Sequence, residues 1–71
     1  MVKTTDRPDL LAKAKELGYQ VVPNTDEPIG KFALLNPDGQ KCWRADTEED
    51  CWVRAMRHAD VYINLIERRD G

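Results

Sequence analysis

The fold is decided by residues 31–43, KFALLNPDGQKCW, in which two short apolar runs flank Asn-Pro-Asp-Gly. Pro37 fixes its own φ at the second position of a turn, and Gly39 is free to adopt the left-handed region. These residues predict a type I turn followed by a glycine bulge. The turn pairs Asn36 with Gln40 and joins two antiparallel strands into a hairpin.

The register of this hairpin follows by counting back from the turn. Four cross-strand pairs are predicted: Leu35 with Lys41, Leu34 with Cys42, Ala33 with Trp43, and Phe32 with Arg44. Successive pairs alternate between the two faces, so both faces carry apolar residues. Such a sheet is usually covered in part on both sides, or exposes one aromatic side chain for a reason. We expect Trp43 to be partly exposed beside Arg44 or Arg54, on the face opposite Phe32 and Leu34. Burial of Trp43 under the first helix is the alternative.

A short helix and a strand are predicted before the hairpin. Apolar residues at spacings of three and four indicate a helix over residues 7–17, with Leu10, Leu11, Ala14 and Leu17 on one face. Thr5 or Asp6 is placed to cap its start, and Gly18 to end it. The aromatic and β-branched residues 19–22 predict a strand that Pro23 ends, followed by a loop over residues 23–30.

A long helix is predicted after the hairpin, within ADTEEDCWVRAMRHADVYINLIERR. Thr47, followed three residues later by Asp50, approximates a capping box. The acidic residues of the first turn suit the positive end of the helix dipole. The apolar stripe of this helix consists of Trp52, Ala55, Met56, Ala59, Tyr62, Ile63 and Ile66.

These elements predict one α+β domain over residues 1–71: a helix, a three-stranded antiparallel sheet and a long C-terminal helix. The predicted core consists of Leu10, Leu17, Val21, Phe32, Leu34, Trp52, Met56 and Tyr62. The hydrophobic fraction of 41% and charged fraction of 34% are ordinary for a globular protein. No apolar run is long enough to cross a membrane, so the expected location is the cytoplasm, where Cys42 and Cys51 are thiols.

The residue types offer little for catalysis or metal binding. The chain has no serine, and its one histidine, His58, lies about two helical turns, roughly 10 Å, from Cys51. Cys42, Cys51 and His58 lack the paired spacing of a metal site, and no glycine-rich loop could cradle a phosphate. We therefore predict a non-enzymatic protein with no catalytic residue, no metal and no cofactor.

The predicted order of elements resembles that of double-stranded RNA-binding domains. In that family the second helix opens with lysines that grip phosphates. Here it opens with acids, Asp46, Glu48, Glu49 and Asp50. The loop TDEPIGKF also lacks the Gly-Pro-x-His pattern of the family. The resemblance therefore covers topology only.

A second resemblance is to small phage and prophage proteins that form an α/β/α sandwich. It is carried by the hairpin with NPDG and by ADTEEDCWVRAM, in which Thr47 and Trp52 match the cap and the early tryptophan of that group. This resemblance implies a phage-related setting but no activity, because those proteins are themselves functionally obscure.

The strongest candidates for binding are an aromatic residue and four cations. Lys41, Arg44, Arg54 and Arg57 are predicted to form a basic patch beside Trp43. Tryptophan with arginine is a common composition of interaction hot spots. Because the net charge is −2 and acids interleave with the arginines, we expect a protein partner, as yet unidentified. Binding of nucleic acid through the same four cations is the alternative.

Overall fold

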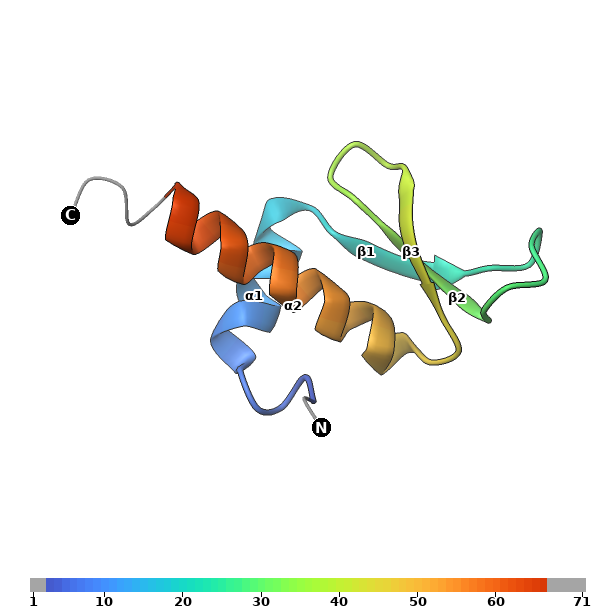
Figure 1. The fold of residues 1–71 in the computed structure, drawn as a ribbon, viewed down its shortest axis with the longest axis horizontal. Coiled ribbons are helices and arrows are strands. Elements are labelled where there is room, and N and C mark those ends of the chain that lie inside the picture. Colours follow the sequence, from blue (N-terminus) through green and yellow to red (C-terminus); the bar gives the residue numbers. More distant parts are fainter. Residues whose placement is uncertain (1–2, 67–71) are drawn as a thin grey trace.

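Five elements follow one another in the computed structural model, which describes residues 3–66. They are α1 (Pro8–Leu17), β1 (Gln20–Pro23), β2 (Phe32–Leu35), β3 (Lys41–Ala45) and α2 (Glu48–Leu65). The sheet is antiparallel with strand order β1-β2-β3 (Figure 1). This is the α-β-β-β-α order and the α+β class predicted from the sequence.

The ends of the helices depend on local capping. The Thr47 side chain accepts a hydrogen bond from the Asp50 amide at 3.1 Å, which confirms the predicted cap of α2. Gly18 ends α1 at φ 109°, and the amides of Gly18 and Tyr19 donate to the carbonyls of Lys15 and Ala14 in a Schellman pattern. The prediction for the start of α1 is wrong. Its N-cap is Arg7, and the cap makes no side-chain hydrogen bond.

The turn of the hairpin forms as predicted. The Asn36 amide donates to the Gln40 carbonyl at 2.9 Å, the Gly39 amide donates to the Asn36 carbonyl at 2.8 Å, and Gly39 has φ 85°. The Asn36 side-chain oxygen also accepts hydrogen bonds from the amides of Asp38 and Gln40. Leu35 pairs with Lys41, as counted from the turn.

The other predicted pairs are wrong because the ladder shifts by one residue after Leu35. The observed partners are Leu34 with Trp43, Ala33 with Arg44, and Phe32 with Ala45. Cys42 is therefore the extra residue of a bulge. In the predicted register Arg44 would have shared the face of Phe32 and Leu34, where burial of an unpaired charge is costly. The bulge moves Arg44 to the other face and brings Trp43 to the face of Leu34.

The elements form layers, with α2 lying across one face of the sheet and α1 packed mainly against α2 (Figure 1). The fully buried side chains at their junction are Ala14, Leu34, Cys51, Ala55 and Ala59. Of the remaining predicted core residues, Leu10 and Met56 are buried, and four are partly buried against the cluster: Leu17, Val21, Phe32 and Trp52. Pro23, predicted to end β1, is its last paired residue, opposite Phe32.

The C-terminal turns of α2 extend past the elements that cover the rest of the helix (Figure 1). Tyr62, predicted as core, is 37% exposed, and Val61, Leu65 and Ile66 are more exposed. The helical periodicity of the stripe is right, but α2 has 18 residues and α1 only 10. At 1.5 Å per residue, α2 is roughly 12 Å longer than its neighbour, so its last turns are only partly covered, with Lys13 of α1 lying over the Tyr62 ring.

Candidate protein-binding surface

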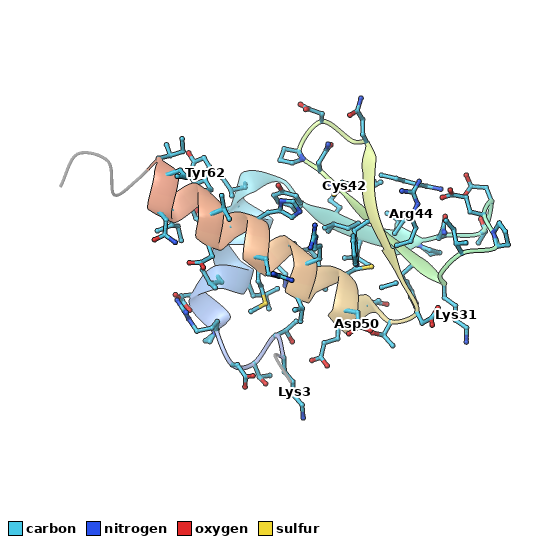
Figure 2. All side chains as sticks on the ribbon, in the orientation of Figure 1. Lys3, Lys31, Cys42, Arg44, Asp50 and Tyr62 are labelled. Atoms are coloured by element: carbon cyan, nitrogen blue, oxygen red, sulfur yellow. The ribbon has the colours of Figure 1, made fainter. Side chains whose placement is uncertain are left out.

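The face of the sheet opposite α2 carries a network of charges that holds the loop of residues 24–31. Lys41 Nζ donates to Asp26 Oδ1 at 2.7 Å, to Asn24 Oδ1 at 2.9 Å and to Glu27 Oε1 at 3.2 Å. Arg44 donates from Nε and Nη2 to the two oxygens of Glu27, at 3.1 and 3.2 Å. In Figure 2 the Arg44 side chain leaves β3 on the side of this loop. The loop therefore neutralises both cations of β3.

The hydrogen bonds of this network lower the pKa of the Glu27 carboxyl, first through Arg44 and then through Lys41. Asn24 is the buried polar residue at its centre, with 5% exposure. Its side-chain amide donates to the carbonyls of Ile29 and Gly30. This arrangement fixes the loop beside β3 and has the composition of a structural ion-pair cluster.

On the other face of β3, Trp43 is 40% exposed and packs against α2 through Arg54. The Arg54 guanidinium lies over the indole, with Cζ 4.3 Å from the ring centroid, within the range of a cation–π contact. Arg54 Nε is buried and has no hydrogen-bond acceptor among the described residues. A buried charged donor without an acceptor is uncommon in a folded domain.

These two side chains line an open hollow of about 350 Å³ between β3 and α2. We call its lining the Trp43 surface, which consists of Trp43, Arg44, Ala45, Asp46, Asp50, Val53, Arg54 and Arg57. Asp46 and Asp50 lie at the end where β3 turns into α2, and Asp50 is labelled on the first turn of α2 in Figure 2. Arg54 and Arg57 lie one and two turns further along the helix. The Trp43 surface is thus acidic at one end and basic at the other.

A second hollow, of about 470 Å³, lies further along α2 and is lined by Tyr19, Arg54, Arg57, His58, Val61 and Tyr62. The rings of Tyr19 and His58 are stacked, with centroids 5.6 Å apart and planes at 22°. Burial lowers the pKa of His58, and the charges of Arg54 and Arg57 lower it further. The imidazole therefore favours its neutral form next to two arginines.

The predicted basic patch does not form as one unit. Trp43, Arg54 and Arg57 line the same hollow, to which Arg44 also contributes, but the Arg44 guanidinium binds Glu27 and lies with Lys41 on the opposite face of the sheet. Asp46, Asp50 and Val53 also line the Trp43 surface, although the sequence indicated only that Asp46 and Asp50 lie at the start of α2. Nothing in the local pattern connects these residues with Trp43, because the bend between β3 and α2 brings them together.

Chemistry-bearing side chains are dispersed over the molecule. Cys51 is buried, Cys42 is partly buried, and burial raises the pKa of both thiols. Within residues 3–66, no group of three or more His, Cys, Asp and Glu side chains is placed to hold a metal ion. In the same part of the chain, no helix has both the length and the apolar character needed to cross a bilayer.

Comparison of the chain with models of protein families, with curated proteins and with solved structures finds no match. The resemblances to phage sandwich proteins and to double-stranded RNA-binding domains therefore stay predictions.

Proposed function

We propose that this chain is a non-enzymatic protein-binding domain that contacts its partner through the Trp43 surface. The observation that carries the proposal is the 40% exposed indole of Trp43 under the Arg54 guanidinium, at the edge of an open hollow. Large aromatic residues and arginines supply most of the binding energy in protein interfaces. A rigid indole already held by a cation also loses little side-chain entropy on binding.

The charges of the hollow favour a protein over a polyanion. Asp46 and Asp50 share the surface with Arg54 and Arg57, so a phosphate backbone would meet repulsion as well as attraction. Lys41 and Arg44 already bind Glu27. A protein surface, which carries both signs of charge, can complement the acidic end and the basic end at once.

The proposal is tested by comparing what the immobilised wild-type chain and its variants retain from a lysate of the source organism. Trp43→Ala is expected to lose the retained protein. Leu65→Ala is the matched control, because Leu65 is 63% exposed on the C-terminal turns of α2, away from the Trp43 surface. Circular dichroism of both variants establishes that they are folded. Equal retention by Trp43→Ala and the wild type would refute the proposal.

Nucleic-acid binding through Lys41, Arg44, Arg54 and Arg57 is the alternative, and a salt titration distinguishes it. Binding to phosphates weakens steeply with salt, in proportion to the number of charges neutralised. Contact with a protein through Trp43 predicts that binding weakens less steeply with salt. A steep slope that Arg54→Gln and Arg57→Gln each reduce, with Trp43→Ala unchanged, would favour the alternative.

A further inference from the structure

Strand β3 has one unpaired edge, because it is the last strand in the order β1-β2-β3. Residues 43–46 line a hollow on each side of that edge: the Trp43 surface on the α2 side and a hollow of about 430 Å³ on the other. Ile29, Gly30 and Cys42 complete the second hollow. An exposed strand edge offers backbone donors and acceptors to an added strand, whose side chains point alternately to the two faces.

The charges next to the β3 edge indicate what kind of partner strand can pair with it. Asp50 and Arg57 line the same side of α2, seven residues apart, with Arg54 between them. When two copies of a helix lie antiparallel, residues at equal distances from the crossing point come to face each other. A crossing between Val53 and Arg54 therefore places Asp50 of each copy opposite Arg57 of the other. The surface is complementary to itself.

We infer that the partner of the Trp43 surface is a second copy of this chain, joined through antiparallel pairing of the two β3 edges. This inference rests on the proposed function, since it identifies the partner of the same surface. The pairing makes one six-stranded sheet, with the two α2 helices side by side on one face. Trp43 of each copy lies at the centre of the interface, where contact residues are best shielded from water.

One observed contact and one estimated spacing support this arrangement. The Arg54 guanidinium is 4.3 Å from the ring centroid of Trp43, the middle residue of β3, so the side chain next to the crossing point on α2 reaches the middle of the strand. A single two-fold axis can therefore relate both the two β3 strands and the two α2 helices. Because α2 lies mainly over β2 and β3, pairing at a strand spacing of about 4.8 Å puts the two helix axes roughly 10 Å apart. That separation is near the usual spacing of packed helices, 8–10 Å.

Sedimentation of the purified chain from micromolar to millimolar concentration is the first test. A monomer–dimer equilibrium is expected, and it should shift toward monomer in Trp43→Ala. Asp50→Arg and Arg57→Asp should each weaken self-association by about tenfold or more, because each replaces two attractive pairs of the dimer with two repulsive ones. Combining the two substitutions in one chain should restore self-association, since every pair is then attractive again.

Glu49→Arg is the matched control for Asp50→Arg. It reverses a charge in the same turn of α2, but the Glu49 carboxylate accepts a hydrogen bond from Thr4, on another side of the helix. It should leave the dimerisation constant unchanged. Isotope-filtered nuclear Overhauser contacts between the Trp43 indole of one copy and β3 of the other are expected in the wild-type dimer.

Two results would overturn the inference. One is a dimer that Leu65→Asp abolishes and Asp50→Arg leaves intact, which would place the interface on the C-terminal turns of α2. The other is a chain that stays monomeric at millimolar concentration. If that monomer still retains a protein that Trp43→Ala loses, self-pairing fails and the proposed function stands. If retention is also insensitive to Trp43→Ala, both fail.

Discussion

The Arg54 guanidinium covers one face of the Trp43 indole, with 4.3 Å between Cζ and the ring centroid. This contact joins α2 to the edge strand of the sheet and fixes the indole at 40% exposure. It also favours one side-chain position for this partly exposed indole, since a cation–π contact at an exposed site contributes about 0.5–1 kcal/mol. The same contact keeps the basic end of the Trp43 surface next to its aromatic centre.

Trp43 is therefore expected to be accessible to small quenchers. In a Trp52→Phe variant, Trp43 is the sole tryptophan, and its fluorescence at low protein concentration should be quenched readily by acrylamide. The further substitution Arg54→Ala should increase this quenching, because it uncovers the ring face. A blue-shifted emission that resists acrylamide in the dilute Trp52→Phe protein would contradict the exposure of Trp43.

Gly30 and Gly39 provide a matched pair of alanine substitutions. Both have positive φ, 86° and 85°, so the backbone strain of Gly→Ala should be similar, about 1 kcal/mol. A Cβ on Gly39 would meet nothing within 4 Å, whereas a Cβ on Gly30 would lie 3.0 Å from the Ala45 nitrogen and 3.1 Å from its carbonyl oxygen. Gly30→Ala should cost roughly 1–3 kcal/mol more, because backbone atoms must move.

Urea unfolding of the two variants measures this difference. Similar midpoints for Gly30→Ala and Gly39→Ala would mean that the loop of residues 24–31 does not lie against β3 as described. An unchanged midpoint for Gly39→Ala relative to the wild type would contradict the left-handed position in the turn.

Glu27→Gln should lower the thermal midpoint, because within residues 3–66 Glu27 is the one carboxylate that hydrogen-bonds to both Lys41 and Arg44. Asp26→Asn is the control: among the described residues Asp26 hydrogen-bonds to Lys41 and not to Arg44, and its side chain is 73% exposed against 29% for Glu27. The effect of Asp26→Asn should therefore be smaller. A larger loss in Asp26→Asn than in Glu27→Gln would show that the bidentate contact with Arg44 is unimportant.

The stability of the network should also depend on pH. The native contacts lower the pKa of Glu27 below the ordinary value of 4.5 for a glutamate carboxyl. Above that value the carboxylate is ionised in both states and its contribution to stability is complete. As the pH falls below it, the unfolded chain takes up the proton first, so stability is lost. Glu27→Gln should remove this part of the acid sensitivity.

His58 predicts a separate pH dependence at higher pH. Its pKa in the folded protein is lowered from 6.5, so the unfolded chain binds a proton more readily than the native one. Stability is therefore complete above pH 6.5 and falls as the pH decreases toward the native pKa of His58. His58→Phe retains an aromatic ring beside Tyr19 and cannot titrate. The thermal midpoint of His58→Phe should stay level over this pH range. A wild-type midpoint that rises on acidification would contradict the burial of the imidazole.

Local signals in the sequence determined the order of the elements and the ends of several of them. The Asn36 turn, the Thr47 cap and the Gly18 terminus each depend on residues within about five positions of one another, so the short-range pattern is sufficient. The combination of Trp43 with Arg54 and Arg57 was also recognised from residue type. That these side chains lie on one surface also depends on how α2 packs on the sheet. Helical periodicity indicated this packing only approximately.

The tertiary structure decided the register, the charge pairing and the extent of the core. The bulge at Cys42 forms in place of the regular register because it removes Arg44 from the buried face. Only the whole sheet defines that face. The carboxylates that bind Lys41 and Arg44 lie 14 to 17 residues away in the sequence, at positions that no local pattern connects with the two cations. Tyr62 continues the apolar stripe of α2, yet Lys13 of α1, which lies over its ring, still leaves the residue 37% exposed. Periodicity assigns a residue to one side of a helix, and burial also requires a neighbour on that side.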